Sequence, residues 1–200
     1  MRAAPGRSEC GTGGALSRHA GLTGRAVSRT TDDDGAVEPG THEPSRLYVV
    51  AAFVPRRTAV VVGSLGCRTL ERGWQAYVGS ARRGRGARVA RHMRAAKPLR
   101  WHADFVFSRA PATRAWLIDA PAGAGLDECS LAAALSEVAA AATPAGTARQ
   151  AGGFGAGDCG CAGHLVRFPS LASLAEAVAA VTARLGGRVS AEVWRTAARG

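Results

Sequence analysis

The chain has 200 residues, of which 46% are hydrophobic, and a formal net charge of +11 at pH 7. This length is enough for one compact domain, and the positive charge favours an acidic partner such as nucleic acid. No stretch reaches the roughly 20 apolar residues of a membrane span, and no apolar N-terminal segment is typical of a secretory signal. The five cysteines, an odd number, therefore predict reduced thiols or a metal rather than a disulfide framework, and we expect a cytoplasmic protein with no membrane contact.

The first 45 residues differ in composition from the rest of the chain. They are rich in Gly, Ser, Thr, Pro and Arg and show no sustained apolar period, which predicts a disordered, low-complexity tail over 1–45. From Arg46 onward, apolar runs alternate with turn residues. The predicted strands cover 47–54, 58–63, 73–79, 101–107, 114–118 and 164–168. The second run is the natural antiparallel partner of the first, with a connecting loop between Gly66 and Gly73.

Three helices are predicted from apolar spacing and from their end signals. They cover 87–96, 126–142 and 170–185. Pro98 stops the first, Asp127 and Glu128 lie at the start of the second, and Ser170 is a candidate cap for the third. These elements predict an α/β fold of the α+β type, with a small central antiparallel sheet flanked by helices. We expect one domain over 46–168 and a C-terminal helical extension over 169–200.

The positive charge is concentrated in one segment. Between Glu71 and Asp104 the chain carries nine Lys or Arg residues and no acid, a pattern typical of nucleic-acid binding. The candidate phosphate contacts are Arg82, Arg83, Arg85, Arg91, Arg94 and Lys97. Arg88 and His92 stand four residues apart, so on a helix they project from one face and can meet at one phosphate.

The order of several motifs resembles the GIY-YIG nuclease superfamily. The motifs are Tyr48 in a first strand, Tyr77-Val78-Gly79 ending a later one, Arg88 on the next helix and Glu128 opening a further helix. Over about residues 46–168 the chain is similar to the branch called domain of unknown function 123, sometimes fused to endonuclease-III-type DNA glycosylases. The first motif, Arg46-Leu47-Tyr48, lacks the glycine for which the superfamily is named. The asparagine that often completes the site has no clear counterpart, and Asp158 is the candidate for it.

The resemblance implies a GIY-YIG-like nuclease domain that cuts phosphodiesters with one divalent metal. Glu128 would hold Mg²⁺ or Mn²⁺, and Arg88 would neutralise charge on the phosphoryl oxygens. Tyr48 or Tyr77 would orient or deprotonate the attacking water, and His92 is a candidate proton carrier.

A second cluster of chemically active side chains lies near the end of this region. Cys159, Cys161 and His164 stand within six residues, and together with Cys129 they offer the four ligands of a tetrahedral zinc site. Thiol chemistry and simple packing of the cysteines are the alternatives. His102 and Asp104 are predicted to form a pair on one strand face. The tryptophans at strand positions, Trp74, Trp101 and Trp116, are predicted to be core.

Two functions follow from these patterns. The first is a metal-dependent endonuclease acting on DNA in repair or processing. The alternative is a non-catalytic nucleic-acid-binding module, stabilised by zinc, that targets a DNA-repair protein partner.

Overall fold

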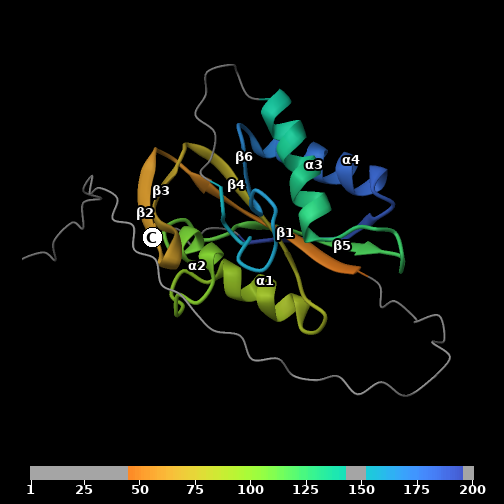
Figure 1. Ribbon diagram of the computed structural model, residues 1–200, viewed down its shortest axis with the longest axis horizontal. Coiled ribbons are helices and arrows are strands. Elements are labelled where there is room, and N and C mark those ends of the chain that lie inside the picture. The colour runs from red at the N-terminus through yellow and green to blue at the C-terminus, as the bar shows by residue number, and fades with distance from the viewer. Residues whose placement is uncertain (1–44, 143–151, 196–200) are drawn as a thin grey trace, which may run out of the picture. The chain divides into compact units, whose positions relative to one another are not determined.

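The strands are arranged in an antiparallel sheet and a separate hairpin (Figure 1). The computed structural model describes residues 45–142 and 152–195, and within them the main sheet has five strands in the order β6-β4-β1-β5-β7. These strands are β1 (Ser45–Val54), β4 (Gly73–Ser80), β5 (Arg114–Ala120), β6 (Leu165–Phe168) and β7 (Arg188–Trp194). The hairpin consists of β2 (Thr58–Val62) and β3 (Gly66–Leu70), joined by a short 3-10 turn.

Strand β1 lies at the centre of the sheet because β4 and β5 pair with its two edges. Its side chains alternate between two cores: Leu47 and Val49 belong to one, and Tyr48 and Val50 to the other. Both faces of the strand are buried, which explains why the segment is an almost continuous apolar run rather than an alternating one.

The helices cover the two faces of the sheet in pairs (Figure 1). They are α1 (Arg85–Met93), α2 (His102–Phe107), α3 (Glu128–Ala141) and α4 (Leu171–Arg184). The first two and the hairpin pack against the core that contains Tyr48, whereas the last two pack against the core that contains Leu47. Asp127 and Ser170 cap α3 and α4 by accepting the backbone N–H three residues later, at 2.7 and 3.0 Å, as Asx and Ser caps do.

The predicted fold class is confirmed: the protein is an α+β fold with a central antiparallel sheet flanked by helices. The strands predicted near 47–54, 73–79, 114–118 and 164–168 and the three predicted helices are all present. None of the helices in the described part of the chain is long and apolar enough to cross a membrane. The predicted tail over 1–45 falls almost entirely on residues 1–44, which lie outside the described residues, as do 143–151.

The strand predicted over 58–63 is present as β2, but its predicted pairing is wrong. Residues 58–63 were expected to pair with 47–54, but β2 pairs with β3 instead because both edges of β1 are taken by β4 and β5. The loop predicted from Gly66 to Gly73 consequently contains a strand.

Residues 102–107 form helix α2, with Trp101 as its N-cap, where a strand over 101–107 was predicted. The Asp104 carboxylate accepts the backbone N–H groups of Arg100 and Trp101, each at 3.0 Å, and so caps the helix start. Helical spacing also suits Ala103, Val106 and Phe107, which are all buried. His102 and Asp104 therefore do not share a strand face as predicted.

The expectation of a purely helical segment over 169–200 is wrong for β7, which pairs with β5 at the edge of the main sheet. Helix α4 shares its core with α3. Residues 169–195 are thus packed into the same fold as the strands that precede them.

Candidate active site and metal centre

The five side chains implied by the nuclease resemblance line one cavity of about 300 Å³. They come from different elements: Tyr48 from β1, Tyr77 from β4, Arg88 and His92 from α1, and Glu128 from the first turn of α3. The rest of the lining consists of Gly79, Ser80, Arg100, Trp101, His102, Gly155, Gly157 and Asp158. The fold therefore gathers at one place lining residues that are up to 110 positions apart in the sequence, from Tyr48 to Asp158.

Two glycines allow the tyrosine rings to lie against the backbone. Tyr48 stands opposite Gly79 in the β1–β4 register, and a Cβ atom on Gly79 would come within 2.5 Å of the Tyr48 hydroxyl. Gly155, with φ of +77°, packs in the same way on Tyr77, where a Cβ would come within 2.8 Å of the ring. Larger residues at either position would displace the phenols.

Tyr48 and His92 form a buried polar pair. The Tyr48 hydroxyl and the His92 Nε2 are 3.2 Å apart, and both residues are at most 2% exposed. Burial raises the pKa of Tyr48 to about 12 and lowers the pKa of His92 to about 4. At neutral pH both side chains are therefore uncharged. Burial also raises the pKa of Tyr77.

Arg88 lies at the exposed side of the cavity. Its Nη1 donates to the Ser80 carbonyl at 3.0 Å, and its guanidinium lies 5.4 Å from the centre of the Trp101 ring. No carboxylate pairs with it among the described salt bridges. Its charge is thus available to an anion in the cavity.

An ion pair behind the cavity fixes α1 to α2. Arg91 Nη2 donates to Asp104 Oδ2 at 2.6 Å, and Asp104 is fully buried. Burial by itself would raise the pKa of Asp104, but the N–H groups of Trp101 and Arg100 and the Arg91 guanidinium hold it below its usual value. The Asp104 carboxylate is therefore ionised and serves as an anchor for both helices.

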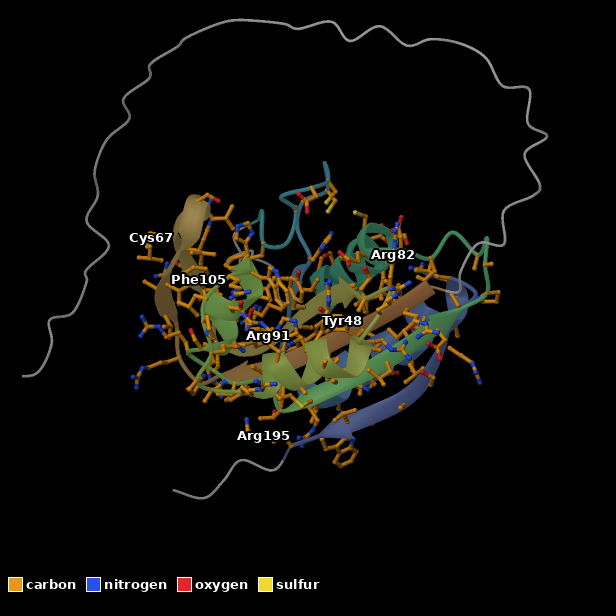
Figure 2. The ribbon with its side chains drawn as sticks, turned by 90° about the horizontal axis from the view of Figure 1, so that it is seen from below. Tyr48, Cys67, Arg82, Arg91, Phe105 and Arg195 are labelled. Atoms are coloured by element: carbon orange, nitrogen blue, oxygen red, sulfur yellow. The ribbon has the colours of Figure 1, made fainter. Side chains whose placement is uncertain are left out.

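The predicted nucleic-acid contacts separate into two groups. Arg82, Arg83 and Arg94 are exposed, and Tyr48 falls between Arg91 and Arg82 in the view of Figure 2. Three others are engaged inside the fold. They are Arg85, which is 2.6 Å from Asp119, Arg91, which is bound to Asp104, and Lys97, which donates to the Arg91 and His92 carbonyls at 3.3 and 3.0 Å.

Glu128 is held at the cavity by neighbours on two sides. One carboxylate oxygen, Oε2, is 3.3 Å from His164 Nδ1, an ion-pair distance without the alignment of a strict hydrogen bond. Burial would raise the pKa of Glu128, but the neighbouring His164 and Ser80 hold it below the usual value. The carboxylate is ionised and its side chain is 30% exposed.

The four predicted zinc ligands meet in space. Ligand atoms of Cys129, Cys159, Cys161 and His164 all lie within 4.8 Å of one another. His164 Nε2 is 3.6 Å from the sulfur atoms of both Cys129 and Cys159, and a tetrahedral zinc separates sulfur and nitrogen ligands by about 3.6 Å. The Cys159 and Cys161 sulfur atoms are 3.0 Å apart, closer than the roughly 3.8 Å between two sulfur ligands of a tetrahedral zinc. The donor set and the sulfur–nitrogen separations suit a metal such as zinc.

The sequence prediction missed several lining residues. Trp101 is 39% exposed at the cavity, so the prediction that it is core is wrong, whereas Trp116 is buried as expected. His102 Nδ1 accepts the Gly155 backbone N–H at 3.3 Å and so ties α2 to the loop. The sequence signals for this loop were its high glycine content, the candidate Asp158 and the cluster of Cys159, Cys161 and His164.

The family comparison covers most of this structure. The family model for the domain of unknown function DUF123 matches residues 47–187, well over half of the 200 residues, and the chain belongs to this family. The matched region includes the cavity, the cysteine and histidine ligands and α4. No match was found among curated proteins or among solved structures.

Proposed function

We propose that the protein is a metal-dependent endonuclease that hydrolyses phosphodiester bonds in DNA, in repair or processing. The observation that carries the proposal is the single cavity in which Tyr48, Tyr77, Arg88, His92 and Glu128 converge. The resemblance of these residues to the GIY-YIG nuclease superfamily supports the reaction type. The excess of positive charge supports nucleic acid as the substrate.

The acidic groups of the cavity suit a hard divalent cation. Glu128 is ionised and lines the cavity together with Asp158. Mg²⁺ and Mn²⁺ prefer oxygen ligands, and Mg²⁺ commonly keeps several waters beside one or two carboxylates. Glu128 would hold the ion, with Asp158 beside it. When bound, the metal supplies Lewis-acid stabilisation of charge on the phosphoryl oxygens.

Arg88 is the side chain that would bind the scissile phosphate. It is exposed, lies over Trp101 and has no carboxylate partner among the described residues. A guanidinium can donate two hydrogen bonds to a phosphate and stabilise the charge that develops there.

Tyr48 would orient the attacking water. Its raised pKa keeps the hydroxyl protonated at neutral pH, so the phenol acts through hydrogen bonds rather than as a charged base. In the tautomer that carries its hydrogen on Nδ1, the His92 Nε2 accepts a hydrogen bond from the Tyr48 hydroxyl. The Tyr48 oxygen can then accept a hydrogen bond from Arg88 and, with its second lone pair, one from water. Tyr77, packed against Gly155, shapes the adjoining part of the cavity.

The test is cleavage of labelled duplex, flapped, branched and damaged DNA by the full chain in Mg²⁺, Mn²⁺ or EDTA. Glu128→Gln should reduce cleavage by roughly 1000-fold while DNA affinity is kept. Glu137→Gln, an exposed carboxylate further along α3, is the matched control and should cleave like the wild type.

Arg88→Ala should lower both cleavage and affinity, because it removes a phosphate contact. Cleavage by Glu128→Gln at the wild-type rate would contradict the assignment of this residue. Salt-sensitive binding by folded wild-type protein without any cleavage would favour the alternative, a non-catalytic binding module.

A further inference from the structure

His164 stands between the cysteine cluster and the cavity. Its Nε2 faces the sulfur atoms of Cys129 and Cys159, each at 3.6 Å. Its Nδ1 faces Glu128 Oε2 at 3.3 Å. The imidazole is buried, and Nδ1 has no other polar neighbour within bonding distance among the described residues. One ring thus connects the two sites.

The backbone reinforces this connection. Glu128 and Cys129 are adjacent in the first turn of α3, so one helix start contributes a side chain to each site. Cys159 and Cys161 lie in the same loop as Gly155, Gly157 and Asp158, which line the cavity. A metal held by these cysteines would therefore join the loop to the start of α3.

The loop has few other interactions to hold it. Among residues 152–164, Phe154 is the fully buried apolar side chain. Two backbone hydrogen bonds close the loop. The Gly153 N–H donates to the Ala162 carbonyl at 2.8 Å, and the His164 N–H donates to the Phe154 carbonyl at 2.6 Å. Glycines occupy much of the remainder, and such a segment loses considerable conformational entropy when it is ordered.

We propose that the cluster of Cys129, Cys159, Cys161 and His164 binds zinc and, through the His164 ring, positions the Glu128 carboxylate in the cavity. Glu128 is in turn an outer-sphere partner of the zinc. The use of Glu128 in cleavage rests on the proposed function, whereas its coupling to the zinc does not.

The chemistry of zinc–histidine–carboxylate triads explains the coupling. Zinc on Nε2 places the remaining ring hydrogen on Nδ1, where it is donated to Glu128 and fixes the orientation of the carboxylate. The carboxylate makes the imidazole a stronger zinc ligand. Because coupling between two binding sites is reciprocal in free energy, a cation bound to Glu128 must alter zinc affinity by the same factor that zinc alters the affinity for that cation. Removing the Glu128 carboxylate removes the outer-sphere acceptor and should weaken zinc binding.

Zinc affinity of the full chain provides a test that needs no catalytic activity. Reduced protein is titrated against a chromophoric zinc chelator for the wild type, Glu128→Gln and Glu137→Gln. We expect one zinc per wild-type chain and a loss in affinity of about tenfold to 100-fold for Glu128→Gln, as for other outer-sphere partners. Glu137→Gln should match the wild type. Co²⁺ loading should give thiolate charge-transfer bands of the same shape in all three proteins, because the ligands themselves are unchanged.

Zinc affinity of Glu128→Gln equal to that of Glu137→Gln would overturn the proposal, and so would a reduced wild-type chain that binds no zinc. Cleavage assays on the same samples separate this inference from the proposed function. Weaker zinc binding by Glu128→Gln with no cleavage by the wild type leaves the coupling in place and removes the nuclease. Loss of cleavage by Glu128→Gln with unchanged zinc affinity would support the nuclease and remove the coupling.

Discussion

The cavity has two walls of different construction. The tyrosine wall consists of Tyr48 and Tyr77 on the sheet and His92 on α1, and it is continuous with the hydrophobic core. The loop wall consists of residues 152–164 and the first turn of α3, where sulfur atoms and His164 replace most of the apolar contacts. The first wall is ordered by burial, whereas the zinc proposal makes the order of the second depend on a metal.

This difference determines where each kind of perturbation should act. Burial keeps the groups of the tyrosine wall uncharged, so their geometry is sensitive to packing and to pH. The loop wall should be sensitive to chelators and thiol reagents instead. Substitutions that affect only one wall can therefore separate the contributions of packing and metal.

The largest loss of stability is expected when the ion pair behind the tyrosine wall is broken. Asp104 is fully buried and bound to Arg91, so Asp104→Asn should lower the free energy of unfolding by about 3–5 kcal/mol. Asp119→Asn is the control, because the Asp119 side chain is 31% exposed beside Arg85, and its loss should cost about 1 kcal/mol. Urea unfolding measures both, and equal losses would contradict the anchor role of Asp104.

Acid should destabilise the protein through His92. In the unfolded chain His92 gains a proton near pH 6.5, but in the folded chain its pKa is about 4. The unfolded state therefore binds more protons between these values, and stability falls as the pH drops through this window, by about 3 kcal/mol in total.

The variant His92→Phe removes this titration while keeping a ring next to Phe107 and Trp101. Unfolding measured at a series of pH values should show a shallower loss of stability for His92→Phe than for the wild type. If the free energy of unfolding falls equally with pH in both proteins, the claim that His92 is neutral and buried is contradicted.

Two glycine substitutions should have opposite signs. Gly79→Ala would place a Cβ atom 2.5 Å from Tyr48 and should cost about 1–3 kcal/mol by overpacking. Gly86 is exposed on helix α1, and a Cβ there would meet nothing within 4 Å. Gly86→Ala should therefore stabilise by about 1 kcal/mol, because Ala is the better helix former. Thermal unfolding distinguishes the two, and a neutral Gly79→Ala would mean that Tyr48 is not held against β4.

The smallest effects are expected on the salt dependence of DNA binding. Arg82→Ala and Arg83→Ala should each reduce the slope of log affinity against log salt by about 0.9 if each contacts one phosphate. Arg85→Ala should leave the slope unchanged and lower stability, because Arg85 is engaged with Asp119. An equal slope change in all three would mean that Arg85 is as available to DNA as the exposed pair.

The sequence predicted the elements whose local signals agree with their packing. The apolar run of β1 and the caps Asp127 and Ser170 lie where expected. Residues 101–107 were misassigned because their apolar residues fit both periods, and the choice is made by the tertiary contact of Asp104 with Arg91. Strand β7 was missed because it is an edge strand with mostly exposed side chains, which leaves little alternation to detect.

The candidate site could be predicted as a set of residues but not as an arrangement. The family resemblance pointed to Tyr48, Tyr77 and Glu128, and the structure places them at one cavity. The engagement of Arg85 inside the fold could not be predicted, because its partner Asp119 lies 34 residues away. The contact between His164 and Glu128 likewise depends on how the loop meets α3.

The measurement that tests the two-wall account most directly is hydrogen exchange of the zinc-loaded and zinc-free full chain. We predict that zinc removal increases amide exchange in residues 152–164 and at the start of α3, while β1, β4 and α1 keep their protection. Faster exchange throughout the sheet would contradict the account by showing that the metal holds the whole fold. Unchanged exchange in the loop would contradict it by showing that the metal holds neither wall.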